Sequence, residues 1–595
     1  MGTLELGVIG NCQVSALVDM FGRYVWACLP RLDGDPVFCS LLRQDTPGDE
    51  HGLFAIELTG EVRVEQVYER NTAILITTLM NSEGARVRIT DFCPRFRQYG
   101  RNFRPVMIIR IVEPLAGHVV IRPRLRPLSD YGAASATRYL GSNHVRFESK
   151  SMIWRVSTDM SLNALLEERL VVLREPASFV MGVDETVGEN IGALAKRFLE
   201  ETRRYWREWT RELAIPFEWQ AAVIRAAITL KLCSFEDSGA VLAALTTSIP
   251  EAANSGRNWD YRFCWLRDSY FTIHALNRLG ATKTMEGYLQ YINNVFAAAN
   301  DRPLQPVYGI SGEPELAEII VSKLPGYRGM GPVRCGNQAY EQTQHDVYGA
   351  AILAATQTFF DQRLANLGNA AVFEQLESAG EDCWKHYDKP DAGIWEFRGR
   401  TRVHTFSSVM CWAGVDRLVR IARHLQLFDR EEFWRKRANS MREQIMAASW
   451  NSQLKTFTEG WETSTVDASV LLLADLDFVA ADDPKFIATV DYLGGHLRRG
   501  NYLLRYVERD DFGVPQNAFN ICTFWYINAL AAIGRKEEAR NLFENMLARC
   551  NHLGMLSEDL DPATGELWGN FPQTYSMVGI VNSAMRLSCS WEDAL

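Results

Sequence analysis

The spacing of apolar and polar side chains divides this chain into two parts. Up to about residue 185, short segments alternate apolar and polar residues, as in 62–68, 106–112 and 144–149, and Gly, Asn, Pro and Asp separate them. Many short segments of this kind predict the antiparallel strands of a β-sandwich. From residue 186 the apolar period lengthens to that of a helix. The pattern predicts a β-sandwich domain over 1–185, a linker helix within 186–215, and a helical domain over 216–595.

The helical part contains twelve predicted segments, and the connections between them alternate between long and short. The segments are 217–235, 264–280, 284–300, 341–363, 370–387, 407–427, 430–450, 467–479, 483–497, 518–534, 535–550 and 573–588. Helices joined by short loops are antiparallel neighbours, so all long connections would lie at one end. Six helical hairpins in a ring would form an (α/α)6 barrel with its site at that end. The alternative is an open helical array, whose repeats should share a period. The sequence has no such period.

Composition and charge narrow the class of protein. A chain of 595 residues is too long for one core, which agrees with a multidomain β + α fold. A net charge of −10 argues against nucleic acid as a partner. No apolar run is long enough to cross a membrane, and the first residues do not resemble a signal peptide. The 12 cysteines form no C-x-x-C pair, which favours reduced thiols in a cytoplasmic protein.

Motifs for metals and nucleotides are missing from the sequence. It has no H-E-x-x-H, no G-x-G-x-x-G between a strand and a helix, and no phosphate-binding G-x-x-x-x-G-K-[ST]. We therefore expect no metal and no cofactor. The oligomeric state is left open, with a homo-oligomer among the alternatives.

The segment from Asn258 to Asp268 carries the densest chemistry in the chain. Its eleven residues include two carboxylates, two guanidiniums and four aromatic rings. Aromatic faces stack on sugar rings, and charged side chains bind hydroxyl groups by strong hydrogen bonds. The segment therefore predicts a pocket for a carbohydrate. A helix start with a buried ion pair is the alternative.

Cleavage of a glycosidic bond usually needs two carboxyl groups, one protonated and one ionised. Glu396 is the candidate acid, because Trp395 and Phe397 on either side would desolvate it and favour its protonated form. The alternative is a solvated turn residue paired with Arg398. Glu558 is the candidate base, expected to be exposed so that it can hold water. By residue type alone it competes with Asp559, Glu566, Asp260 and Asp268.

Several motifs resemble glycoside hydrolase family 15, which contains glucoamylases, glucodextranases and bacterial trehalases. The resemblance covers nearly the whole chain. It rests on the W-x-R-D motif ending at Asp268 and on the segments 391–399, 524–525, 556–559 and 569–573. Residues 10–12, 26 and 30–31 resemble the β-domain that opens bacterial members. The resemblance implies the general acid at Glu396 and the general base at Glu558. It also implies substrate contacts from Tyr261, Trp265, Arg267, Asp268, Trp395, Arg505 and Tyr575, with a helix-core role as the alternative for Tyr575.

Two positions depart from the family pattern. Ser408 stands where bacterial members often have Lys, and Met577 stands where they often have His. Both changes bear on the outer part of the pocket and leave the two carboxyl groups intact.

The residues and the resemblance together predict an enzyme that hydrolyses a small α-glucoside, and the resemblance implies inversion, with release of β-glucose. Trehalose is the first choice of substrate. A glucoamylase-like or glucodextranase-like enzyme acting on maltose, isomaltose or maltodextrins is the alternative. A carbohydrate-binding protein without activity is a further alternative, which the presence of both carboxylates disfavours.

Overall fold

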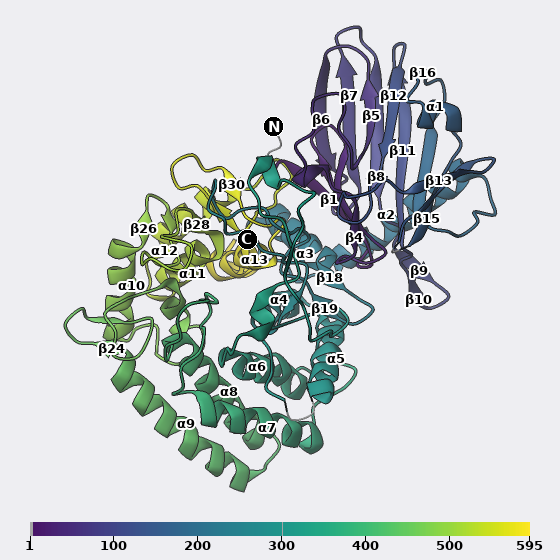
Figure 1. Ribbon diagram of the computed structural model, residues 1–595. Helices are drawn as coiled ribbons and strands as arrows, with labels where there is room; N and C mark the ends of the chain where they lie inside the picture. The colour runs from purple at the N-terminus through teal and green to yellow at the C-terminus, as the bar shows by residue number, and fades with distance from the viewer. Residues whose placement is uncertain (1–3, 151, 300–301, 595) are drawn as a thin grey trace.

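Two antiparallel β-sheets make up the first part of the chain in the computed structural model, which describes residues 4–150, 152–299 and 302–594 (Figure 1). One sheet has the order β1 (Leu6–Gly10), β2 (Ser15–Asp19), β3 (Tyr24–Leu29), β5 (Leu53–Leu58), β12 (Val120–Arg126), β16 (Val171–Val172), with β4 (Asp35–Phe38) paired to β3. The other has the order β13 (Thr137–Leu140), β14 (His144–Glu148), β15 (Ile153–Thr158), β17 (Ala177–Val183), β11 (Met107–Ala116), β8 (Arg86–Phe92), β7 (Leu75–Asn81), β6 (Val62–Tyr68).

Aromatic side chains join the two sheets face to face. Phe54 on β5 packs against Phe179 on β17, with ring centroids 5.2 Å apart. Phe38 on β4 packs against Trp154 on β15 at 6.4 Å. These rings occupy inward-facing positions on their strands. Because successive side chains of a strand point to opposite faces of the sheet, apolar inward positions alternate with outward ones, which gives the period-2 pattern in the sequence. The prediction of a β-rich N-terminal region is confirmed.

The rest of the chain is helical. After the short α1 (Leu162–Leu166) of the β-rich part, the long α2 (Ile191–Arg211) links the two parts. The helices that follow are α3 (Gln220–Leu232), α4 (Leu266–Arg278), α5 (Thr282–Ala299), α6 (Asp346–Phe360), α7 (Ala370–His386), α8 (Thr405–His424), α9 (Phe428–Ser449), α10 (Pro484–His496), α11 (Asn520–Ala532), α12 (Lys536–Leu547), α13 (Thr574–Leu587) and α14 (Trp591–Ala594).

Alternate helical elements contact one another in a closed cycle. The cycle runs α4, α6, α8, the 3-10 segment Ala468–Leu473, α11, α13 and back to α4. The helices between them, such as α5, α7 and α12, pack on the outside of this cycle (Figure 1). The burial patterns explain the arrangement, because twelve of the thirteen residues of α11 are buried, whereas α9 buries only a narrow stripe. A helix that is apolar all round must be covered on every side.

One predicted helix, over 467–479, is wrong. The chain there forms only a 3-10 turn from Ala468 to Leu473. Asp467 caps this turn by accepting a hydrogen bond from the backbone N–H of Ser469, and Asp477, with φ of 63°, reverses the backbone soon after. A run of consecutive apolar residues fits any buried conformation, so it did not distinguish this turn from a helix. The predicted helix 341–363 also starts later, at Asp346.

The β-rich part packs directly on the helical part. The indole N–H of Trp26 donates to the backbone oxygen of Leu245 at 2.9 Å. The side chain of Asn551 donates to the backbone oxygens of Leu4 and Leu6 at 3.0 and 2.9 Å. Figure 1 shows β1 and β4 beside α3 and β18 (Ser234–Phe235). The first sheet therefore supports the loops around the segment 245–262.

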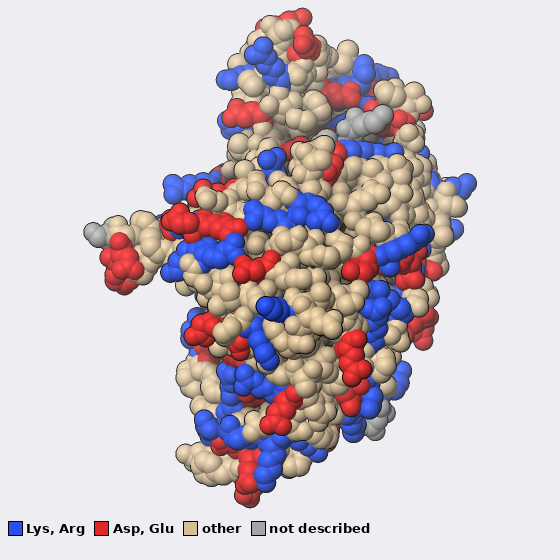
Figure 2. Space-filling view, turned by 90° about the vertical axis from the view of Figure 1, so that its left-hand side faces the viewer, with Lys and Arg blue, Asp and Glu red and all other residues tan. Residues whose placement is uncertain are grey.

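The surface carries mixed charge. Lys and Arg alternate with Asp and Glu over the face shown in Figure 2, without one continuous area of either sign. Within the described residues, no helix is both long and apolar enough to span a bilayer.

Candidate active site

A pocket of about 900 Å³, including open solvent at its mouth, lies where the long connections converge. Its walls come mainly from the connections 236–263, 301–340, 388–406 and 498–517 and from the starts of α4, α11 and α13. Eight of the nine predicted site residues line it: Tyr261, Trp265, Arg267, Asp268, Trp395, Glu396, Arg505 and Tyr575. The two remaining long connections, 451–466 and 551–572, contribute none of the described residues that line the pocket.

The segment around Tyr261 is anchored on its inner side by a buried ion pair. Asp260 and Arg262 are both fully buried and lie 2.7 Å apart. Arg262 also reaches the N-terminal part, donating to the backbone oxygen of Gly34 at 2.9 Å and to the Tyr131 hydroxyl at 2.8 Å. Tyr261, between the two charged residues, lines the pocket. The anchoring explains how one short segment contributes both a buried ion pair and a binding surface.

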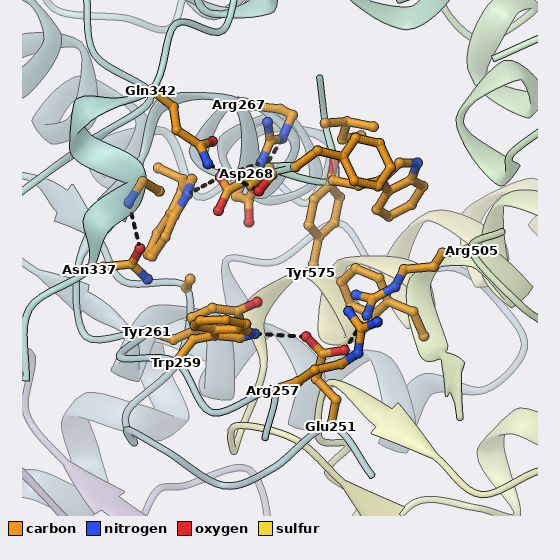
Figure 3. Close-up of a pocket in the computed structure, with 18 of the residues that line it drawn as sticks. Glu251, Arg257, Trp259, Tyr261, Arg267, Asp268, Asn337, Gln342, Arg505 and Tyr575 are labelled. Atoms are coloured by element: carbon orange, nitrogen blue, oxygen red, sulfur yellow. Dashed lines mark hydrogen bonds and ion pairs between the residues drawn. The ribbon is translucent and has the colours of Figure 1, made fainter. Parts of the chain in front are cut away.

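Trp265, Arg267 and Asp268 form the inner end of the pocket at the start of α4, and Figure 3 shows Arg267 and Asp268 side by side there. Arg267 donates to the carboxylate of Asp268 at 3.1 Å and lies 3.3 Å from the carboxylate of Asp346. Burial raises the pKa of Asp268 to about 6, although the guanidinium of Arg267 acts in the opposite direction. The inner end thus presents paired charges that are suited to binding hydroxyl groups.

Glu396 is held at the pocket wall by donors from other loops. Its Oε1 accepts hydrogen bonds from Trp265 Nε1 at 2.7 Å and from Gln344 Nε2 at 3.2 Å, and Arg267 Nη2 lies 3.5 Å away. The side chain is 23% exposed. Its backbone φ of 58° is in the left-handed region, which is costly for a residue with a side chain. The alternative of a free turn residue paired with Arg398 is wrong, because Arg398 forms its ion pair with Glu318.

Glu558 lies behind Tyr261 and is only 1% exposed. The hydroxyl of Tyr261 donates to Glu558 Oε1 at 2.6 Å. Gly569 lies close on the other side, where a Cβ would approach Glu558 Cβ to 2.6 Å. The expectation of an exposed base was therefore wrong, because tertiary neighbours far along the chain cover this carboxyl group.

A second acidic residue, Glu251, changes the electrostatics around Glu558. It accepts a hydrogen bond from the Trp259 indole at 2.9 Å and forms an ion pair with Arg505. Burial, followed by the nearby charge of Glu251, raises the pKa of Glu558 above its usual range, and the hydrogen bond from Tyr261 opposes this rise. The arrangement favours a carboxyl group that binds a proton readily, as a general base requires.

The remaining predicted residues complete the wall. Trp395 donates its indole N–H to Asp467 at 2.6 Å, which fixes its ring against Trp525 at 6.1 Å. Tyr575 is 3% exposed, and its buried hydroxyl has no hydrogen-bond partner among the described residues. Figure 3 shows Tyr575 between Arg267 and Asp268 on one side and Arg505 on the other. Tyr575 thus lines the pocket and also packs in the core at the start of α13, so the structure combines the two alternatives.

Sequence reasoning missed part of the lining. Glu251, Arg257, Gln342 and Phe512 all line the pocket. The position of Glu251 in a long connection could have indicated that it lies near the pocket. Gln342 gave no such signal, because the sequence placed it inside the predicted helix 341–363. Ser408 and Met577, the two departures from the family pattern, are buried, and neither is among the described lining residues. Within the described part of the chain, no cluster of three or more His, Cys, Asp or Glu is suited to a metal ion.

An aromatic pocket with two oriented carboxyl groups and paired guanidiniums defines the class of protein as a glycoside hydrolase. Residues 219–585 match the family model described as glycosyl hydrolases family 15. The chain is 31% identical to a trehalase of Thermoplasma volcanium, over 98% of this chain and 93% of that protein. It is 30% identical to a trehalase of Mycolicibacterium smegmatis, over 99% and 92%. The chain therefore belongs to glycoside hydrolase family 15.

A solved structure is similar over the whole fold. The crystal structure of a bacterial glucoamylase complexed with acarbose matches 98% of this chain and 94% of its own, with a TM-score of 0.67 and 15% identity. At this identity the similarity concerns the fold, with its β-rich N-terminal region and helical C-terminal region.

Proposed function

We propose that this protein hydrolyses trehalose with inversion, using Glu396 as general acid and Glu558 as general base. The observation that carries the proposal is the placement of the two carboxyl groups on one aromatic pair. The rings of Tyr261 and Trp265 lie 5.3 Å apart. Tyr261 donates to Glu558, and Trp265 donates to Glu396. One short segment therefore holds both groups: Glu396 lines the cavity, and Glu558 lies directly behind the lining residue Tyr261. The trehalase relatives, similar over nearly their whole length, support the choice of substrate.

The proposed reaction needs only these groups and water. Glu396 transfers its proton to the oxygen that bridges the two glucose units, and the bond from that oxygen to the anomeric carbon breaks. Glu558 takes a proton from a water molecule that attacks the same carbon from the opposite face. Inverting glycosidases place such carboxyl groups about 6.5–9.5 Å apart. One glucose leaves as the β anomer, and the other keeps its α configuration.

Binding of the reacting glucose is assigned to the inner end of the pocket. Asp268 and Arg267 would bind its hydroxyl groups, and Arg505 would reach it from the opposite side. The unpartnered hydroxyl of Tyr575 supports a polar contact with the substrate, since a buried polar atom usually has a partner. Trp395 would supply an apolar wall.

We also propose the architecture in its finer form. The facing sheets support a β-sandwich domain over 1–185, with α2 as the linker in 186–215. The closed cycle of alternate helices supports an (α/α)6 barrel over 216–595. A cytoplasmic location is consistent with twelve free cysteines, nine of them buried.

The second candidate is a glucoamylase-like or glucodextranase-like enzyme, favoured by the fold of the glucoamylase structure. Glucose release from trehalose, maltose and isomaltose, measured side by side, separates the two. Glu396→Gln and Glu558→Gln should both abolish release, and Glu432→Gln on the exposed face of α9 is the matched control. Release from trehalose alone supports the proposal. Release from maltose or isomaltose in preference to trehalose overturns it.

A further inference from the structure

Five residues from four different loops meet at the exposed end of the pocket, and we call them the rim cluster: Trp259, Glu318, Arg398, Asp511 and Phe512. All except Glu318 line the pocket. Arg398 and Asp511 are exposed, whereas Arg267 and Tyr575 at the other end are buried. The rim cluster therefore marks the outer limit of the cavity.

Polar contacts tie three of these loops together at the rim. The backbone N–H groups of Arg398 and Gly399 donate to Asp511 at 2.9 and 3.0 Å, which joins the loops 388–406 and 498–517. The guanidinium of Arg398 lies 2.8 Å from Glu318 in the loop 301–340. Arg334 holds Glu318 in turn, at 2.6 Å. The Arg398 side chain thus extends from one loop to another at the outer end of the pocket.

Ring contacts add the fourth loop. Trp259 and Phe512 pack edge to face with centroids 5.0 Å apart. The guanidinium of Arg398 lies 4.6 Å from the ring centre of Trp259 and 5.9 Å from that of Phe512. Arg–aromatic contacts of this kind are favourable and orient the guanidinium. Arg398 is therefore fixed by an ion pair, by two rings and by its own backbone.

We propose that the rim cluster limits the substrate to two sugar units, an inference that rests on the proposed hydrolysis of trehalose. The reacting glucose fills the inner end, and the second glucose fills the space between Glu396 and the rim. A third unit would have to extend through the space that Arg398 spans. It would displace the Arg398 side chain from Glu318 and from the rings of Trp259 and Phe512, so these contacts would be lost. A side chain held across the path of a longer ligand is a source of specificity, because the longer ligand clashes with it.

The test compares trehalose with a trisaccharide in which one ring of trehalose carries a further α-glucose, as substrates of Arg398→Ala and Asp511→Ala. Both residues are exposed, so both variants should fold, and their melting temperatures are measured alongside. The ratio of kcat/KM for the trisaccharide to that for trehalose should rise about tenfold or more in each variant. Glu432→Ala, which removes an exposed acid of an ion pair on α9, should leave the ratio unchanged.

The outcomes separate the inference from the function on which it rests. A wild-type enzyme that does not cleave trehalose contradicts the proposed function. A wild-type enzyme that cleaves trehalose and the trisaccharide equally well overturns the rim inference alone. An unchanged ratio in both folded variants overturns it as well.

Discussion

Replacing Tyr261 by phenylalanine removes one hydroxyl group and leaves the ring that lines the pocket. That hydroxyl donates to Glu558 Oε1 at 2.6 Å and lowers the pKa of the carboxyl group. A hydrogen bond to a charged group contributes about 1.5–3 kcal/mol. Since about 1.4 kcal/mol corresponds to one pKa unit, the pKa of Glu558 should rise by about one to two units.

The sign of the pH effect follows from the proposed role. A general base works only when it is ionised, so activity is lost below its pKa. In Tyr261→Phe the acidic limb of the kcat/KM profile should therefore move to higher pH by about one to two units. At pH values below both limbs, kcat/KM should fall by about 10- to 100-fold.

The assay is glucose release from trehalose over a series of buffers at constant ionic strength. Tyr387→Phe is the control, because the hydroxyl of Tyr387 is also buried and donates one hydrogen bond, to Gln444, on the outer helices. Its profile should match that of the wild type. An equal loss of activity at every pH in Tyr261→Phe, with no movement of the acidic limb, would refute the reasoning.

Three further predictions concern the surroundings of the carboxyl groups. Gly569→Ala should lower kcat by about 100-fold, because its Cβ would lie 2.6 Å from Glu558 Cβ and 2.8 Å from Oε2 and must displace that carboxyl group. It should also lower the melting temperature, because a φ of 76° is strained for alanine; steady-state kinetics below the melting temperature, with a thermal melt, checks both. Asp268→Asn should abolish activity yet raise the melting temperature at pH 8. Folding raises the pKa of Asp268 from 3.8 to about 6, so the ionised carboxylate destabilises the folded wild type by about 3 kcal/mol above pH 6. Below pH 3.8 the group is protonated in both the folded and the unfolded state, and this cost is absent. The variant should therefore melt at a higher temperature than the wild type at pH 8 but not at pH 3.5. Tyr131→Phe removes the 2.8 Å hydrogen bond that Arg262 donates to Tyr131 in the β-rich part, whereas its hydrogen bonds to Cys28, Asp33 and Gly34 there remain. It should lower kcat by about three- to tenfold, and an unchanged kcat would show that this contact does not position the segment.

The helices were predictable because their apolar period and the long connections between them are local features of the sequence. The starts of α7, α10 and α13 fall within one residue of the predicted starts. The turn at Ala468–Leu473 was not predictable, since six consecutive buried residues give no periodicity from which to choose a backbone.

The candidate site shows the same division between local and tertiary information. The residue types around Trp265 and Glu396 indicated carbohydrate chemistry directly. The burial of Glu558 depends on Tyr261, which is 297 residues away in the sequence, so no local pattern contained it. Glu251 was missed for a related reason. Its role in the site depends on the hydrogen bond from Trp259 and the ion pair with Arg505, and these contacts form only in the folded protein.

The central claim is that two carboxyl groups cleave trehalose with inversion. Proton NMR of the wild-type enzyme with trehalose, recorded in the first minutes before the anomers equilibrate, tests this most directly. The account predicts equal amounts of α- and β-glucose. Release of α-glucose alone would contradict inversion by Glu396 and Glu558, and a spectrum without glucose would contradict the proposed activity.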